Sequence, residues 1–424
     1  MKKELMSGKK KKENKGGKNG KKSSTVEAGT ILRRFLKTYE KHCVQTQSIA
    51  SITIAKNVQY CCEHEKIMTK ILLASPEAAT ANTPPVYLKP LLMTIRDERY
   101  MFGKELCIWN VSVSNQDIAD LSLVLELCGR TRYPFTHLEL LDCGIDVWSA
   151  ERLGKAMCFS ALQEVNLDYN EFSDEGLKGL LSGLSGNCQI VSLSLCYCNL
   201  GPASGYLLGL FITQSAVRDL YVNGNQLQCD GALDLIRMIA EHAENVSLQK
   251  RASSNDEDDK NLTHHHLEDP VSEMSFVDKK PERMQTAGSK SSVTKKKRKH
   301  KGKKKSTKKP PEVGPWLVKL HLADNEIDAK GEEGLRSPLQ FIQMLCLLIK
   351  FSEELSELDM DDNNVGDLCG RLILEALKER KEAKLPDLKV KVTAQMNADT
   401  FSDILKQSQK LKSAKKSKKK KKKK

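Results

Sequence analysis

The sequence predicts an α/β solenoid in which a curved parallel sheet forms the inside and helices form the outside, with a helical N-terminal cap and disordered basic tails. Two observations lead to this prediction. A short frame of alternating apolar residues followed by Asn or Cys recurs along the chain, and successive frames from Leu138 are separated by 27, 28 and 27 residues. That spacing fits one strand and one returning helix per repeat.

The frame reads apolar, any, apolar, two residues, Asn or Cys, any, apolar. Its copies begin at Leu106, Leu138, Val165, Leu193, Leu220, Leu320 and Leu358, the first being degenerate after Ile108, and a terminal strand is expected at Leu388-x-Val390. Alternate strand residues are expected to point into the solenoid. The Asn or Cys side chain is expected to bond to backbone groups that the turn leaves unpaired.

Helical periodicity appears between the frames. Apolar residues recur with a helical period after Gly176 (Leu177, Leu180, Leu181 and Leu184) and after Gly231 (Leu233, Ile236 and Ile239). This spacing predicts amphipathic helices. Each repeat then buries its apolar face only by stacking on its neighbours, so one continuous core is expected.

The run Leu162-x-x-Val165-x-Leu167-x-x-Asn170-x-Phe172-x-x-x-Gly176-Leu177 resembles the ribonuclease-inhibitor class of leucine-rich repeats. The resemblance covers about 104–247 and 315–395. It implies a class whose members serve as inhibitors, GTPase activators, sensors, and axonemal or nuclear scaffolds. The chain departs from two of these, because it has fewer repeats than the inhibitor and no segment that matches an activator's catalytic loop.

The pattern divides the chain into six segments. A lysine-rich disordered tail (1–24) precedes a mostly helical cap (25–103), whose apolar stripes include Ile67, Met68, Ile71 and Leu72. Two blocks of repeats (104–249 and 315–395) flank a disordered insertion (250–314) that is acidic, then basic, and that begins after a helix ending near His242. A lysine-rich tail (396–424) follows. The insertion is expected to loop out without interrupting the sheet.

The net charge of +14 is unevenly distributed. Three short runs (2–22, 295–309 and 410–424) hold 32 of the 69 Lys and Arg residues but two of the 55 acids, which leaves 37 bases and 53 acids, a charge of −16, for the rest. The sequence therefore predicts an acidic body with basic appendages.

The 13 cysteines do not indicate a secreted, disulfide-bonded protein. The first 24 residues are mostly Lys, Gly and Ser, without the apolar stretch of a secretory leader, so we expect a reducing compartment and free thiols. No apolar run approaches the roughly 18 residues needed to cross a bilayer, so no membrane association is expected.

The candidate binding surface is the concave face of the sheet. Its solvent-facing positions carry carboxylates toward the ends and tyrosines in the middle, a composition suited to a protein interface. The residues are Glu139, Asp142, Asp168, Tyr169, Tyr197, Tyr221, His321, Asp324, Asp359, Asp361 and Asp362. The alternative is an ordinary solvated repeat surface. By charge complementarity, the expected partner is a protein with a basic surface, and the chain's own lysine tails are a competing candidate.

The basic run Lys295, Lys296, Lys297, Arg298, Lys299 and Lys301 is dense enough for a nuclear import signal. All three runs suit non-specific binding of nucleic acid or another acidic polymer, and without interleaved aromatic residues they imply no base reading. The alternative is a solubilising or microtubule-attracting tail. The nucleus or nucleolus is therefore the expected compartment, with the cytoplasm, cytoskeleton or cilium as the alternatives.

No catalytic, cofactor or metal site is predicted. The P-loop, the Gly-x-Ser-x-Gly elbow and the His-Glu-x-x-His helix are all absent from the sequence. Cys196-x-Cys198 lacks a second pair at zinc-finger spacing, and Cys198 occupies the structural slot of its repeat. The sequence therefore favours a non-enzymatic scaffold for a protein partner. The alternatives are a nuclear or nucleolar factor that binds nucleic acid through its tails, an axonemal scaffold, and a regulator of a GTPase or nuclease.

Overall fold

The computed structural model of the chain describes residues 19–76, 85–126, 131–260, 312–330, 334 and 336–408, with the backbone alone for 19–27 and 253–260. The chain divides into two units, one holding Met1–Ser247 and Pro311–Lys424 and the other Leu248–Pro310. All the described strands lie in the first unit. Among the described residues, no helix is long and apolar enough to cross a membrane.

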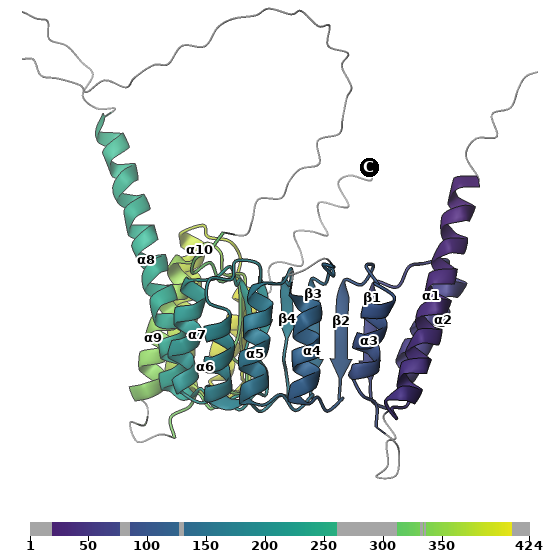
Figure 1. Cartoon of the computed structure of the whole chain (residues 1–424). Coiled ribbons are helices and arrows are strands. Elements are labelled where there is room, and N and C mark those ends of the chain that lie inside the picture. Colours follow the sequence, from purple (N-terminus) through teal and green to yellow (C-terminus); the bar gives the residue numbers. More distant parts are fainter. Residues whose placement is uncertain are drawn as a thin grey trace, which may run out of the picture. The chain divides into compact units, whose positions relative to one another are not determined.

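The described strands form one parallel sheet in chain order (Figure 1). This confirms the predicted solenoid, including the terminal strand at Leu388-x-Val390. The strands are β1 (Lys70–Ala74), β2 (Glu105–Trp109), β3 (His137–Leu141), β4 (Glu164–Asn166), β5 (Ser192–Ser194), β6 (Asp219–Tyr221), β7 (Lys319–His321), β8 (Glu357–Met360) and β9 (Lys389–Val392).

A helix follows each described strand, and the helices lie side by side along one face of the sheet (Figure 1). The other face is called the helix-free face below. The described helices are α1 (Asn19–Gln45), α2 (Ile52–Glu63), α3 (Lys89–Asp97), α4 (Asn115–Leu125), α5 (Val147–Cys158), α6 (Ser173–Gly183), α7 (Ala203–Thr213), α8 (Gln228–Lys260), α9 (Arg336–Phe351), α10 (Gly366–Glu382) and α11 (Ala398–Ser408).

The core lies between the sheet and the helices. The inward strand residues Leu138, Leu140, Leu193 and Leu195 are fully buried. Small residues let neighbouring helices approach closely: a Cβ added to Gly154 of α5 would stand 2.3 Å from the carbonyl oxygen of Leu180 in α6. Each helix thus packs on its neighbour and on its own strand, because a single repeat cannot bury its apolar face alone.

The Asn slot of the frame has the predicted structural role. Asn170 is fully buried, and its amide donates to the carbonyls of Leu140 and Leu167 at 2.7 and 2.8 Å. Its oxygen accepts from the backbone N–H groups of Cys143 and Ile145 at 3.0 and 3.2 Å. One side chain therefore satisfies backbone groups of two neighbouring turns, which would be costly to bury unpaired.

Cysteine fills the same slot with a different bond. The thiol of Cys198 donates to the carbonyl of Leu167 at 3.3 Å, and that of Cys143 to the carbonyl of Ile108 at 3.4 Å. Both cysteines are fully buried. A thiol supplies a weak donor but no amide oxygen, so the Asn of the following repeat bonds to the backbone N–H of each Cys residue.

The long insertion does not interrupt the sheet, as predicted. Asp219 of β6 and Lys319 of β7 are paired neighbours, as are Tyr221 and His321. Most of the insertion lies outside the described residues. The slot at this junction is incompletely satisfied, because the buried side-chain oxygen of Asn325 accepts no hydrogen bond from the residues that the structure describes.

Several predicted boundaries are corrected. The stripe Ile67, Met68, Ile71 and Leu72 is not helical: residues Lys70–Ala74 form β1, in which Ile71 and Leu73 are buried and pairing with β2 decides the conformation. A short apolar run fits a helix or a strand equally well, so this outcome depended on tertiary pairing.

Three helices also cross the predicted segment limits. Helix α1 begins at Asn19, within the segment 1–24 that was expected to be disordered. Helix α8 runs to Lys260, well past His242 and into the segment expected to be disordered from 250. Helix α11 lies in the predicted tail 396–424, and its buried Ile404 and its packing on α10 and β9 make it the last element of the solenoid.

Candidate functional site: the helix-free face of the sheet

Strand register places the outward residues of the helix-free face in rows that run across the sheet. What we call the first row lies where the strands begin and contains Lys70, Glu105, His137, Glu164, Ser192, Asp219, Lys319, Glu357 and Lys389. Two residues further along each strand, the second row contains Leu72, Cys107, Glu139, Asn166, Ser194, Tyr221, His321, Asp359 and Lys391.

The first row neutralises its own charge. Acidic and basic residues occupy neighbouring strands, so each of its four carboxylates has a cationic or imidazole partner. The pairs are Lys70–Glu105 at 3.6 Å, His137–Glu164 at 3.1 Å, Lys319–Asp219 at 2.5 Å and Lys389–Glu357. Hydrogen bonding to Asp219 raises the pKa of Lys319, so the pair favours the charged form of the lysine.

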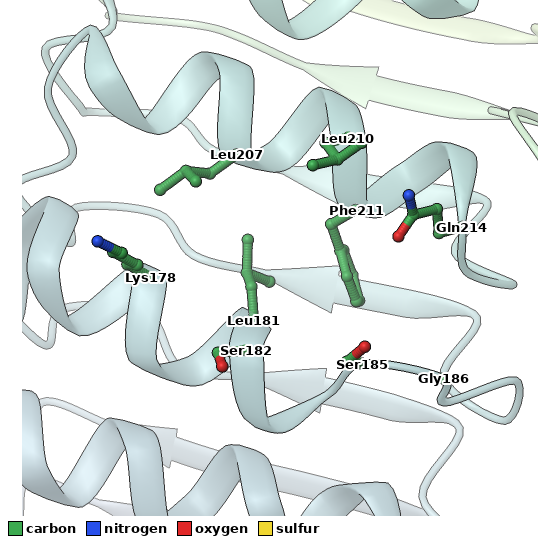
Figure 2. A pocket seen from close by; sticks show the side chains of 9 residues that line it. All are labelled: Lys178, Leu181, Ser182, Ser185, Gly186, Leu207, Leu210, Phe211 and Gln214. Atoms are coloured by element: carbon green, nitrogen blue, oxygen red, sulfur yellow. The ribbon is translucent and has the colours of Figure 1, made fainter.

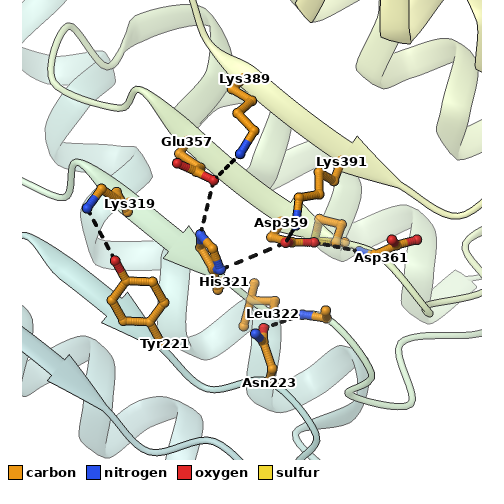
Figure 3. A network of polar contacts seen from close by, with 12 residues as sticks. Tyr221, Asn223, Lys319, His321, Leu322, Glu357, Asp359, Asp361, Lys389 and Lys391 are labelled. Atoms are coloured by element: carbon orange, nitrogen blue, oxygen red, sulfur yellow. Dashed lines mark hydrogen bonds and ion pairs between the residues drawn. The ribbon is translucent and has the colours of Figure 1, made fainter. Parts of the chain in front are cut away.

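Asp359 is a buried member of an ion-pair network, and its expected solvent-facing position is wrong. It is 3% exposed. Its carboxylate pairs with Lys391 of β9 and lies 3.8 Å from Nδ1 of His321, whose Nε2 is 3.5 Å from Glu357 (Figure 3). Strand β9 brings the lysines that convert this acidic end of the face into a neutral cluster.

His321 and Tyr221 belong to the same cluster and are not exposed anchors. Their rings meet edge to face with centroids 4.7 Å apart. The hydroxyl of Tyr221 accepts from Lys319 Nζ at 3.2 Å. Burial lowers the pKa of His321, and this effect outweighs the neighbouring carboxylates, which act in the opposite direction.

Glu139 is likewise held by neighbours within the sheet. It accepts from His137 Nε2 at 2.7 Å and from Trp109 Nε1 at 2.8 Å. Burial alone would raise its pKa, but these hydrogen bonds outweigh burial and lower it. Opposite Glu139 on β2, burial raises the pKa of the Cys107 thiol to about 12.

Asp168 bonds to the next repeat. Its Oδ1 accepts from the hydroxyl of Ser194 at 2.7 Å and from the backbone N–H of Cys196 at 2.8 Å. Burial is the largest influence and raises the pKa of Asp168 despite these bonds. Asp168 therefore fixes the edge of β5 as well as contributing to the face.

What we call the last row lies where the chain leaves strands β2 to β8. Every residue in it has a positive φ, between 50° and 67°, in the left-handed region. The row contains Asn110, Asp142, Tyr169, Tyr197, Gly224, Asp324 and Asp362. Asn, Asp and Gly tolerate this conformation, whereas a tyrosine there costs about 1–2 kcal/mol. Two of the seven positions hold tyrosine in spite of that cost.

Those two tyrosines form an exposed stack. The rings of Tyr169 and Tyr197 are nearly parallel, with an interplanar angle of 3° and centroids 4.9 Å apart. They are 54% and 42% exposed. The ring of Tyr197 lies over Gly224, where an added Cβ would stand 2.1 Å from it. Partial burial, followed by the charges of Asp324 and other neighbours, raises the pKa of Tyr197.

The last row keeps its negative charge uncompensated. Asp142, Asp324 and Asp362 are exposed, and no described lysine, arginine or histidine forms an ion pair with any of them. Asp361, which lies beside this row, is partly exposed and is 3.5 Å from the hydroxyl of Thr393. The acidic, tyrosine-containing surface expected from the sequence is thus confined to one edge of the face.

Sequence reasoning missed the first row and β9. The predicted surface begins after the first apolar position of each frame, so it omits the residues immediately before that position, which are His137, Glu164, Asp219 and Lys319. The period of two in a strand was a signal that would have found them. Lys389 and Lys391 belong to the terminal strand, for which the sequence analysis predicts no surface residues.

Two further features lie away from this face or beyond the described chain. An apolar groove runs between α6 and α7 and is lined by Leu181, Leu207, Leu210 and Phe211 among others (Figure 2). The predicted import signal, from Lys295 to Lys301, lies outside the described residues. None of the described cysteines forms a disulfide.

Comparison with known proteins found similarity to ribonuclease inhibitors. The chain is 31% identical over 129 residues to a "Ribonuclease inhibitor" of Sus scrofa, and 34% identical over 107 residues to a "Ribonuclease inhibitor" of Mus musculus. These matches cover 29% and 23% of this chain, and the chain spans 28% and 24% of the two relatives. No family model matches. The parallel strand–helix repeats and this similarity together identify the fold as a leucine-rich-repeat solenoid that resembles the ribonuclease-inhibitor type.

Proposed function

We propose that this protein is a non-enzymatic scaffold that binds a basic segment of a protein partner along the last row of its helix-free face. The observation that carries this proposal is the exposed stack of Tyr169 and Tyr197 in the left-handed conformation. The fold sets a positive φ along the whole row, but it does not require tyrosine there, and a residue kept in a costly conformation points to a role in binding. The similarity to ribonuclease inhibitors supports a protein-binding role in general, without indicating the partner or the face that binds it.

The chemistry of the last row favours Arg or Lys on the partner. Stacked tyrosine faces attract a cation, and Asp324 and Asp362 supply unpaired negative charge on the same edge. Rigid aromatic residues lose little conformational entropy on binding, and they are the residue types that most often dominate interface energies. The first row lacks these properties because its charges are already paired within the sheet.

The test compares partners captured by proximity labelling in cells. The full chain and a Tyr169→Ala/Tyr197→Ala variant are compared with a Tyr206→Ala control, which removes an equally exposed tyrosine from α7. Proteins labelled by the wild type and the control are expected to disappear with the double variant. Retention of the same partners by the double variant, with the fold verified by circular dichroism, would contradict the proposal.

Ribonuclease regulation is a second candidate, favoured by the similarity to ribonuclease inhibitors. The purified chain is then expected to lower the turnover of a ribonuclease, and the Tyr169→Ala/Tyr197→Ala variant is expected to lower it less. Unchanged turnover at a large excess of the chain removes this candidate.

Nucleic-acid binding through the lysine runs, with nuclear residence directed by 295–301, is a third candidate. The segregation of charge into those runs favours it. Binding to duplex DNA is expected to fall steeply with salt, with a log–log slope of about −0.9 per neutralised phosphate. A chain that lacks 410–424 and 295–309 should lose this binding, and should leave the nucleus. Salt-independent binding, or unchanged residence of the shortened chain, argues against it.

A further inference from the structure

A sulfur, a nitrogen and an oxygen ligand converge on the helix-free face between β2 and β3. Cys107 stands opposite Glu139 in the strand register, and His137 precedes Glu139 by two residues on the same face of β3. The three ligand atoms all lie within 4.8 Å of one another. The cysteine is fully buried, whereas the imidazole and the carboxylate are 22% and 16% exposed.

The surrounding residues already orient these groups as outer partners orient metal ligands. The second ring nitrogen of His137 is 3.1 Å from a carboxylate oxygen of Glu164 on β4. The second oxygen of Glu139 accepts from the indole N–H of Trp109 at 2.8 Å. A ligating histidine almost always has such a carboxylate or carbonyl partner on its free nitrogen, which fixes the ring and leaves the other nitrogen for the metal.

We propose that Cys107, His137 and Glu139 form a binding site for a single Zn²⁺ ion. A mixed set of thiolate, imidazole and carboxylate ligands suits zinc better than the oxygen-binding cations Mg²⁺ and Ca²⁺. One thiolate and one carboxylate balance the charge of a divalent ion. Three protein ligands leave one position of a tetrahedral ion open for water or another ligand.

The required movement is small. Nε2 of His137 and Oε1 of Glu139 are 2.7 Å apart because they share a hydrogen bond. Zinc bond lengths of about 2.0–2.1 Å and tetrahedral angles place such atoms about 3.3 Å apart. Replacing the shared proton by the ion therefore needs them to separate by about 0.6 Å, while the thiol moves closer by a rotation of its side chain.

The site also has a route of entry. His137 and Glu164 line a shallow hollow on the helix-free face, together with Ser192, Ser194 and Tyr221. The open ligand position faces this side of the sheet, since the opposite side is the buried core. Of the three ligands only His137 lines this hollow, but the imidazole and the carboxylate of Glu139 are both partly exposed, so an ion can reach them from solvent while the buried thiol turns toward it.

The test is a zinc titration of the full chain by competition with a chromophoric chelator, in variants that replace His264, His265 and His266 with alanine so that this histidine run adds no background. We expect one tight site. Cys107→Ser and Glu139→Gln should each weaken zinc binding by about 100-fold or more, and Glu164→Gln by about 10–100-fold through the orienting hydrogen bond. The control Cys188→Ser, in the loop after α6, should leave it unchanged.

A second measurement identifies the sulfur ligand directly. Titration with Co²⁺ is expected to give a thiolate-to-cobalt charge-transfer band that is lost in Cys107→Ser and kept in Cys188→Ser. If circular dichroism shows that Cys107→Ser does not fold, the zinc affinity of Glu139→Gln decides whether the proposal stands. Zinc affinity that is unchanged in Glu139→Gln, a cobalt band that survives in a folded Cys107→Ser variant, or no one-site zinc binding by the parent chain overturns the proposal.

Discussion

The first row and the last row cross the same face of the same sheet, yet they treat charge in opposite ways. In the first row, Lys319 pairs with Asp219 and Lys389 pairs with Glu357, so carboxylates and cations satisfy each other. In the last row, Asp142, Asp324 and Asp362 have no such partner. The difference teaches that acidic composition alone does not locate a binding surface, because paired acids stabilise the sheet and unpaired acids remain available to a partner.

The largest expected effect is a difference in the free energy of unfolding between variants of the buried Asp359 and the exposed Asp362. Asp359→Ala removes a buried carboxylate that pairs with Lys391 and accepts from the backbone N–H of Asp361, so we expect a loss of about 3 kcal/mol in the free energy of unfolding. Asp362→Asn, the control in the last row, keeps a residue type that tolerates the positive φ of this position and should change it by less than about 0.5 kcal/mol. Urea denaturation followed by circular dichroism measures both, and equal losses would erase the distinction between the rows.

A smaller loss is expected where the tyrosine stack rests on the backbone. Gly224→Ala introduces a Cβ against the ring of Tyr197 and places a side chain at a φ of 67°. We expect a loss of about 2 kcal/mol and a displaced Tyr197 ring. Gly144→Ala serves as the control, since its φ of 68° is similar but no atom lies within 4 Å of the added Cβ. A loss no larger than in this control shows that the ring contact does not matter.

The pH response should come from the ion-paired region. Because burial lowers the pKa of His321, the unfolded chain binds a proton first as the pH falls below 6.5. The contribution of His321 to stability is therefore complete above pH 6.5 and is lost as the pH falls toward its lowered folded-state pKa. His321→Gln should flatten the decrease in unfolding midpoint between pH 7 and 5, measured by thermal denaturation. An unchanged slope is evidence against this assignment.

The smallest effect is expected at the exposed end of the first row. Lys70 and Glu105 are 43% and 42% exposed and 3.6 Å apart. Lys70→Met should lower the free energy of unfolding by about 0.5 kcal/mol or less, and salt should reduce the difference further. Lys319→Met should cost more, about 1 kcal/mol, because Lys319 is bound at 2.5 Å to Asp219 and also donates to Tyr221. Equal costs at low salt contradict this ranking.

Local patterns were sufficient to predict the repeats, because each frame holds its own evidence. Leu193, Leu195 and Cys198 mark one strand and its turn within six residues, and Leu177, Leu180 and Leu181 give the helical period of α6 in the same way. The β1 strand escaped prediction because Ile71 and Leu73 are too few to distinguish a strand from a helix. Packing against β2 supplied the missing information.

The sequence by itself determined the solenoid, the slot residues and the residue types on the helix-free face, since these follow from periods of two and of about 28 residues. Only the tertiary structure decided which of those residues face solvent. Asp359 and Asp362 are the same residue type in the same repeat. Only Asp359 pairs with Lys391, which lies on a strand that is brought alongside by folding. The approach of Cys107 to His137 and Glu139 likewise depends on the register between two repeats. Side chains on different repeats come together only when the repeats stack, and no pattern within one repeat encodes these contacts.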